Sequence, residues 1–270
     1  MENYICVTCG AQYKESKRPP ENCIICEDER QYLNAEGQQW TTLSEMKTQG
    51  YRNEFRELEP GLVGIHTQPD FAIGQVAYLV RTEAGNVLWD CISYIDEETV
   101  ERIEKMGGVK GIAVSHPHFY SSIVEWSHGL GRPPVYIPLA DKKWVVRPDP
   151  VIQYWDDAKE ILPGVTIIQC GGHFDGSSVL HWRHGAAGKG VLLVGDTMGV
   201  AKDARYVSFM YSYPNLIPLP PPAIRGIMEA LRPYEFDRIY SAWWGKMIPK
   251  GAKEAVEKSG ERYIRHVQAA

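Results

Sequence analysis

The chain has 270 residues, of which 44% are hydrophobic and 23% charged, a composition typical of a globular protein with one large domain and a small additional module. Its net charge of −5 argues against a basic surface for nucleic acid or anionic membranes, and we expect neither partner. No segment approaches the roughly 18 consecutive apolar residues of a membrane span. Residues 1–10 do not resemble a secretion signal, so we expect a cytoplasmic protein.

Four of the six cysteines lie within the first 26 residues, as the C-x2-C motifs Cys6-Val-Thr-Cys9 and Cys23-Ile-Ile-Cys26. A reducing cytoplasm favours metal ligation over disulfides. Each motif turns tightly enough for two thiolates to bind one tetrahedral ion, and two motifs complete its coordination shell. A segment this short cannot bury a core, so metal binding would supply its folding energy. We therefore predict a zinc-ribbon-like module over residues 1–35, with structural zinc, or rubredoxin-like iron as the alternative.

A polar connector and a larger domain are predicted to follow this module. Residues 36–60 are charged and polar, and we interpret them as a connector with one short helix near 44–49. Residues 61–270 alternate short apolar runs with segments of helical spacing, which predicts an α/β domain. Strands are expected at 76–80, 87–89, 111–114, 135–137, 165–169, 179–182 and 191–194, and helices at 97–106, 121–128, 223–231 and 252–267. Four prolines within 218–222 predict a rigid loop.

Three segments of the larger domain carry residues that could bind a metal ion. His116 and His118 follow the strand expected at 111–114, and in an extended segment residues i and i+2 project to the same side. His173 lies in a glycine-rich turn, and Asp196 follows the strand expected at 191–194. Three imidazoles and a carboxylate at strand ends are the ligands that a catalytic zinc site with an open position requires.

The order of these segments resembles the metallo-β-lactamase superfamily. In that family a strand ends in H-x-H-x-D-H, a later turn reads G-H-T-P-G-H-S, and a further strand ends in G-D. Residues 115–121, 172–178 and 195–196 match these motifs, and Asp90 ends an early strand as the family's aspartate does. The resemblance covers the chain from about Leu62 onward.

The resemblance implies an αβ/βα four-layer sandwich with metal at one edge of its two sheets. It also implies that His116, His118 and His173 are ligands of the first metal, with Asp196 adjacent, either ligating the metal or hydrogen-bonding a bound water. The other histidines, His66, His128, His181, His184 and His266, are expected to be surface or packing residues.

Two departures from the family pattern predict a single metal. Tyr120 and Ser121 stand where the family has an aspartate and a histidine, and residues 239–245 contain no histidine where the family's last one lies. The second metal thus keeps at best Asp196. Asp196 and Tyr120 are the candidate catalytic residues: Asp196 to orient the nucleophile or take its proton, Tyr120 to donate a proton, with weak ligation or an aromatic pocket wall as the alternatives for Tyr120.

These residues favour a zinc-dependent hydrolase in which hydroxide on one three-histidine zinc ion attacks a small electrophilic substrate. An isothiocyanate is the substrate that we favour, because isothiocyanate hydrolases occur in the superfamily and the aromatic stretch 209–217 suits an apolar tail. An iron oxidoreductase of the persulfide dioxygenase type, with iron held by His116, His173 and Asp196, is one alternative. A non-catalytic zinc-binding interaction protein is another. The N-terminal module could brace the sandwich, cap the pocket or form a homodimer contact.

Overall fold

Two β-sheets form the centre of the computed structural model, which describes residues 1–268. The strands of the first sheet, in spatial order, are β3 (Arg52–Glu59), β4 (Leu62–Gln68), β5 (Ala77–Thr82), β6 (Gly85–Trp89), β7 (Gly111–Ala113), β8 (Val135–Pro138) and β9 (Ile152–Trp155). Those of the second sheet are β10 (Ala158–Leu162), β11 (Val165–Gln169), β12 (Ser178–Trp182), β13 (Val191–Leu193), β18 (Arg238–Tyr240) and β19 (Met247–Ile248).

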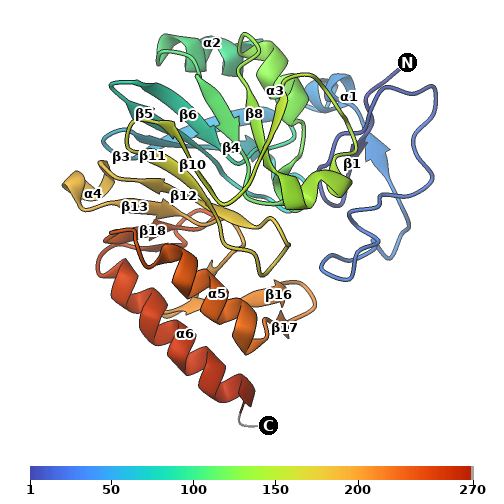
Figure 1. Ribbon diagram of the computed structural model, residues 1–270. Coiled ribbons are helices and arrows are strands. Elements are labelled where there is room, and N and C mark those ends of the chain that lie inside the picture. The colour runs from blue at the N-terminus through green and yellow to red at the C-terminus, as the bar shows by residue number, and fades with distance from the viewer. Residues whose placement is uncertain (269–270) are drawn as a thin grey trace.

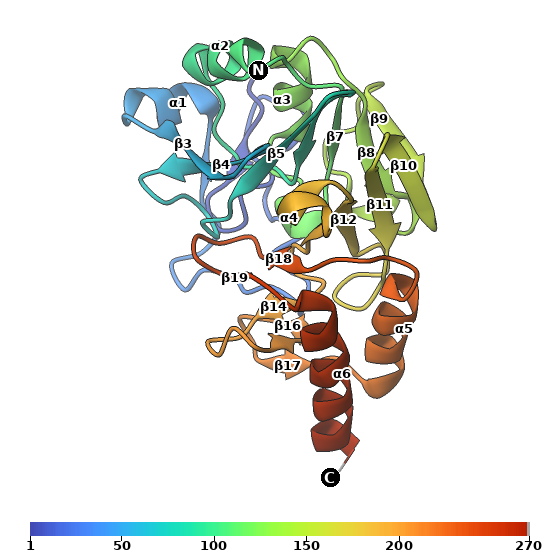
Figure 2. The ribbon, with the colours of Figure 1, turned by 90° about the vertical axis from the view of Figure 1, so that its left-hand side faces the viewer.

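Helices cover the outer face of each sheet. Helices α2 (Glu97–Lys105) and α3 (Ile123–Gly129) lie over the first sheet, and α5 (Pro221–Leu231) and α6 (Ala252–Gln268) lie over the second (Figures 1 and 2). The sequence prediction of a four-layer αβ/βα sandwich is therefore confirmed. Within residues 1–268, no helix combines the length and the apolar character needed to cross a membrane.

The remaining elements are short. They are β1 (Ile5–Cys6), β2 (Trp40–Thr41), α1 (Leu43–Thr48), the 3-10 helices η1 (Pro117–Phe119) and η2 (Leu139–Trp144), α4 (Gly185–Gly188), β14 (Gly199–Val200), β15 (Val207–Ser208), β16 (Met210–Ser212) and β17 (Ile217–Pro218).

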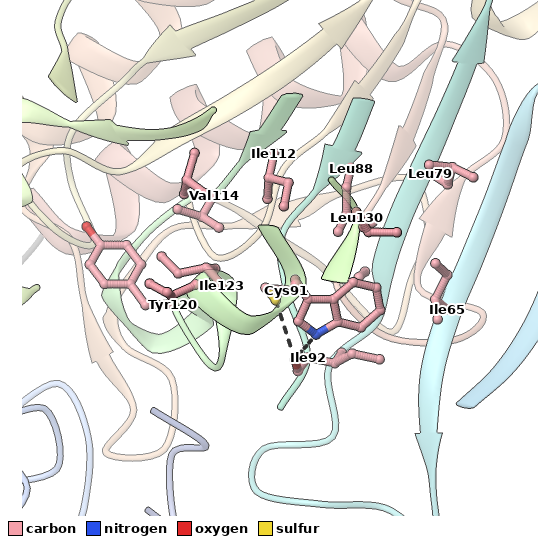
Figure 3. Packing of buried hydrophobic residues seen from close by; sticks show 14 of the residues in the cluster. Ile65, Leu79, Leu88, Cys91, Ile92, Ile112, Val114, Tyr120, Ile123 and Leu130 are labelled. Atoms are coloured by element: carbon pink, nitrogen blue, oxygen red, sulfur yellow. Dashed lines mark hydrogen bonds between the residues drawn. The ribbon is translucent and has the colours of Figure 1, made fainter. Parts of the chain in front are cut away.

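Three hydrophobic clusters fill the three interfaces between the four layers. The first four residues of β5 form a continuous apolar run: Ala77 and Leu79 face α2 and α3, while Tyr78 and Val80 face the second sheet. Successive strand residues point to opposite faces, so a strand buried on both faces needs apolar side chains throughout. Figure 3 shows the outer cluster of the first sheet, in which Leu79 packs near Leu88 and Ile65.

The N-terminal residues pack against the edge of the sandwich near β16 and β17 (Figure 1). Strands β1 and β2 pair antiparallel, with Cys6 opposite Trp40, so this part of the predicted connector belongs to the cysteine module. The predicted connector at 36–60 also contains β3, which pairs with β4 along its whole length. The chain therefore enters the first sheet at Arg52, before the expected boundary at residue 61.

The proline-rich segment 218–222, which was predicted to be a rigid loop, contains parts of a strand and a helix. Pro221 and Pro222 are the first two residues of α5, and Pro218 lies in β17. The missing N–H of proline is no loss in the first turn of a helix, where backbone N–H groups have no partner within the helix, and its fixed φ suits the helical conformation. The helix predicted at 223–231 therefore begins two residues earlier.

Candidate metal centres

The four cysteines of the N-terminal module converge on one point. Their sulfur atoms all lie within 4.8 Å of one another. The Sγ atoms of Cys6 and Cys26 are 3.6 Å apart, as are those of Cys9 and Cys23. These distances are far longer than the ~2.05 Å of a disulfide and match the ~3.8 Å edge of a tetrahedron with metal–sulfur bonds of ~2.3 Å. The four thiolates thus fit a single tetrahedral ion.

Three histidines and an aspartate form a second cluster where the two sheets meet. His116 and His118 follow β7, His173 lies between β11 and β12, and Asp196 follows β13. One potential ligand atom from each lies within 4.8 Å of the others. The centroids of the three imidazole rings are 4.9–5.1 Å apart, and Nε2 of His116 is 3.4 Å from Oδ2 of Asp196. The sequence therefore identified all four members of this cluster.

His118 reaches the cluster by a route that the sequence did not predict. The extended conformation expected through His118 ends at His116, whose φ and ψ are −171° and 171°. Pro117 then begins the 3-10 helix η1, which contains His118. Because the fixed φ of proline suits a first helical turn, Pro117 bends the chain while the two imidazole rings stay 5.1 Å apart.

The loop that carries His173 is held by hydrogen bonds from both sides. Ser177 Oγ accepts a hydrogen bond from the backbone N–H of Phe174 at 2.7 Å, which closes the turn on itself. Oδ1 of Asp141, a fully buried residue in η2, accepts one from the N–H of Gly176 at 2.9 Å. Burial raises the pKa of Asp141 to about 6. Asp141 thereby ties the loop to the first sheet.

Hydrogen bonds orient two of the imidazoles through the ring nitrogen that points away from the centre of the cluster. Nδ1 of His116 is 2.8 Å from Oγ of Ser115, and Nδ1 of His173 is 3.3 Å from the carbonyl oxygen of Met210. A carbonyl oxygen only accepts, so Nδ1 of His173 carries the proton and its Nε2 offers a lone pair to the centre of the cluster. Partners of this kind fix the ring tautomer in metal sites.

Close backbone packing brings Asp196 into the cluster. A Cβ on Gly195, whose φ is +49°, would lie 2.3 Å from Oγ of Ser115, so only glycine fits there. Ser115 in turn donates its backbone N–H to Oδ1 of Asp90 at 2.7 Å. Burial, opposed by this hydrogen bond, raises the pKa of Asp90 to about 8. The family-like aspartate at the end of β6 thus supports the strand ends beside the cluster.

The electrostatic environment favours metal binding by neutral imidazoles. Burial, followed by electrostatic repulsion from the neighbouring His116, lowers the pKa of His173 to about 4. Burial and then the neighbouring His116 and His173 lower the pKa of His118 well below its ordinary value. A neutral imidazole has the lone pair that a metal ion needs. Both rings are therefore in their ligating form at neutral pH.

Unpartnered polar atoms show that the residues fit a metal ion. Within residues 1–268, the buried atoms Nε2 of His116 and Oδ1 of Asp196 have no hydrogen-bond partner. Leaving such atoms unsatisfied costs about 1–3 kcal/mol each. A cation bound among these nitrogens and carboxylate oxygens would satisfy them, and the donor set suits zinc or iron.

The two residues that stand where the family has ligands of the second metal, Tyr120 and Ser121, make other contacts. Ser121 accepts a hydrogen bond from Nε2 of Gln75 at 3.0 Å. Tyr120 lies in the hydrophobic cluster of the first sheet near Ile123 (Figure 3), and burial raises its pKa well above the ordinary value. The catalytic role predicted for Tyr120 stays a prediction, and its surroundings favour packing. Among residues 1–268, the two clusters described above are the only groups with metal-ligand geometry.

The remaining histidines that the structure describes have other partners or lie outside these clusters. His66 contacts the carbonyl oxygen of Gln75 and the carboxylate of Asp70, both at 3.0 Å. His128 pairs with a carboxylate at 3.1 Å, and Nε2 of His181 contacts a carbonyl oxygen at 2.8 Å. Their expected packing or surface roles are consistent with these contacts.

Sequence reasoning missed two side chains that support the histidine cluster. Asp141 follows β8, and an acidic residue after a predicted strand was the only signal for it. Arg30 donates a hydrogen bond to the backbone carbonyl of His173 at 2.6 Å across 143 positions of sequence, and nothing in the sequence indicated that contact.

Comparisons with known proteins identify a close relative and many structures of similar fold. No family model matches the chain. The Bacillus subtilis protein named "Uncharacterized protein YmaE" is 46% identical over 267 residues, which are 98% of this chain and 97% of the relative.

Among solved structures, VMB-1 has a TM-score of 0.59 and 12% identity, covering 80% of this chain and 98% of its own. The metallo-β-lactamase DIM-1 exposed to ceftazidime has a TM-score of 0.58 and 14% identity, covering 78% and 97%. A B3 metallo-β-lactamase with an active-site glutamic acid has a TM-score of 0.54 and 16% identity, covering 85% and 94%. Identities this low concern the fold alone.

Proposed function

We propose that this chain, which belongs to the same family as the Bacillus subtilis protein YmaE and has the metallo-β-lactamase fold, is a hydrolase that uses one zinc ion at its three histidines. The observation that carries the proposal is the cluster of three buried imidazoles and one carboxylate, with ligand atoms within 4.8 Å. A zinc ion in a three-histidine shell lowers the pKa of its bound water to about 7, which supplies a nucleophile at neutral pH.

In this proposal, Asp196 accepts the proton of that nucleophile. Its Oδ2 lies 3.4 Å from Nε2 of His116 and 3.9 Å from Nε2 of His173, so it faces the point on which the imidazoles converge. Its other oxygen, Oδ1, has no partner among residues 1–268 and is free to accept a hydrogen bond. A carboxylate so placed can orient a water molecule and accept its proton.

The single set of ligands favours a small electrophilic substrate. A second cation would be needed to hold a leaving group or a substrate carboxylate, and Tyr120 and Ser121 do not provide its ligands. Aromatic rings surround the cluster: Phe119 is 4.3 Å from His116, and Phe174 is 5.0 Å from His118, between ring centroids. These buried rings make the surroundings of the cluster apolar, which supports a substrate with an apolar tail.

An isothiocyanate is the substrate class that we propose. Water adds across its C=N bond to give a thiocarbamic acid, which loses carbonyl sulfide and leaves the amine. The central carbon is electrophilic enough to be attacked without a second cation. The apolar surroundings that Phe119 and Phe174 give the cluster suit the organic substituent.

The test is hydrolysis of benzyl isothiocyanate by the zinc-loaded protein, measured as the rate at which the amine is released. His116→Ala should abolish turnover, and His184→Ala is the matched control, since this exposed histidine lies outside both clusters. Equal activity in the His116 variant and the wild type would refute the site. Activity of the wild type on a β-lactam or on an ester, but not on the isothiocyanate, would retain the hydrolase and refute the substrate class.

A further inference from the structure

Arg30 joins the cysteine module to the histidine cluster. Its Nε donates a hydrogen bond to the backbone carbonyl of His173 at 2.6 Å. Its guanidinium lies against the rings of Phe174 and Tyr211, 4.5 and 4.4 Å from their centroids. Both carboxylate oxygens of Asp28 lie 2.8 Å from Nη1. With only 14% of its side chain exposed, Arg30 is held in one position.

A second set of contacts fixes the backbone around Arg30. Ser212 Oγ donates a hydrogen bond to the carbonyl of Arg30 at 2.9 Å. Nδ2 of Asn215 donates to the carbonyls of the residues on either side of Arg30, at 3.0 and 2.9 Å. These two side chains belong to the β16–β17 hairpin, beside which the N-terminal segment lies in Figure 1. The same hairpin contributes the carbonyl of Met210 that contacts Nδ1 of His173.

The loop around His173 needs such anchors. Gly171 and Gly172, immediately before it, have φ values of +68° and +92°. Glycines in this conformation give a backbone that loses much conformational freedom on ordering. A metal ion binds tightly only where its ligands are already in place, and neighbours that orient a ligand typically contribute 10- to 100-fold in affinity. Arg30 anchors the ligand residue itself, on its carbonyl.

The cysteine cluster holds the chain segment that leads to Arg30. The N–H groups of Cys26 and Glu27 both donate to the carbonyl of Cys23 at 3.0 Å, which forms the tight turn of the second C-x2-C motif. Arg30 follows this turn by four residues, and its own N–H donates to Oδ1 of Asp28 at 3.0 Å. A segment this small depends on its metal for a defined conformation.

We infer that Arg30 is a positioning residue for the metal ligand His173, and that the four-cysteine module holds Arg30 in place for this purpose. The inference rests on the proposed metal site at the three histidines. Loss of the Arg30 contact should lower the zinc affinity of the histidine site 10- to 100-fold and leave the cysteine site loaded.

The experiment compares the full-length wild type with Arg30→Ala and Arg30→Lys. Zinc affinity of the histidine site is measured by competition with a coloured chelator, and cobalt-loaded protein is examined by visible absorption. Thiolate-to-cobalt charge-transfer bands report the cysteine site alone. Both sites contribute ligand-field bands, so those of the histidine site are obtained as the difference from cobalt-loaded His116→Ala. Arg205→Ala is the matched control, because Arg205 pairs with an aspartate two residues before it at 2.8 Å, as Arg30 does, but is 77% exposed.

We expect Arg30→Ala to lose at least tenfold in affinity at the histidine site, with altered ligand-field bands and unchanged thiolate bands. Arg30→Lys should lose less, because an ammonium keeps the charge but lacks the planar set of donors. Affinities within twofold of the wild type in both variants would overturn the inference, and Arg30→Lys decides if Arg30→Ala does not fold. A wild type that binds no metal outside the cysteines would instead refute the proposed function, and this inference with it.

Discussion

Gly195→Ala is expected to destabilise the protein and to disturb the histidine cluster, although the change adds only one methyl group. The new Cβ would lie 2.3 Å from Oγ and 2.6 Å from Cβ of Ser115, which is fully buried. Ser115 cannot move freely, because its N–H is bonded to Asp90 and its Oγ contacts Nδ1 of His116. The methyl group therefore displaces the strand ends that carry both His116 and Asp196.

The cost has two parts. Placing a residue other than glycine at a φ of +49° costs about 1–2 kcal/mol. Forcing a methyl group into a filled site costs about 1–3 kcal/mol. Together these give about 2–5 kcal/mol, a large fraction of the 5–15 kcal/mol by which folded proteins are typically stable.

Urea unfolding of the two proteins measures this loss, and elemental analysis follows the metal. Gly226→Ala is the matched control, since Gly226 lies exposed within α5 with no atom within 4 Å of its Cβ position. Alanine there should stabilise by up to about 1 kcal/mol. A Gly195→Ala protein as stable as the wild type, with its full metal content, would refute the reasoning.

Four further outcomes are expected. Cys9→Ser should lose the metal of the module and lower Tm by about 5–10 °C, because each kcal/mol of lost unfolding free energy lowers Tm by ~2–4 °C. An unchanged Tm and metal content would refute a structural metal. His173→Ala should lose one metal ion per chain and keep the other, as elemental analysis will show. Tyr120→Phe should leave turnover within about twofold, because Tyr120 packs in the core, whereas a tenfold fall would support its predicted catalytic role. Asp141→Asn should reduce the pH dependence of the free energy of unfolding. Burial raises the pKa of Asp141 to about 6, so the folded state favours the protonated carboxyl. The stability that this carboxyl contributes is present below about pH 4 and is lost as the pH rises through 6. Urea unfolding from pH 4 to 7 should therefore show a wild-type stability that falls by about 1–3 kcal/mol relative to the variant, and parallel curves would contradict this.

The sequence predicted the residues of both clusters because each signal is local. Cys6 and Cys9, or His116 and His118, are close enough in the chain for their spacing alone to indicate a shared ligand geometry. The order of the motifs then predicted the sandwich. The turn at Pro117 could not be read from the spacing, because extended and 3-10 conformations both keep the two imidazoles near each other.

Elements with weak periodicity were missed. Strand β3 is an edge strand in which Phe55 packs on the outer cluster of the first sheet and Leu58 on the cluster between the sheets. Its other residues are polar or charged, so no apolar alternation reveals the strand, and a register shift between Glu57 and Glu59 interrupts it further. The contacts of Arg30 and Asp141 were missed for a different reason, since they join segments far apart in the chain and leave no local pattern.

The most direct test of the account is the number of metal ions per chain, measured by elemental analysis of the wild type, His116→Ala and Cys9→Ser. We expect two ions in the wild type and one in each variant, with zinc as the metal. Three ions in the wild type would contradict a single-metal histidine site. Two ions in His116→Ala would show that the second metal is bound elsewhere, and iron in place of the histidine-bound zinc would contradict the zinc hydrolase.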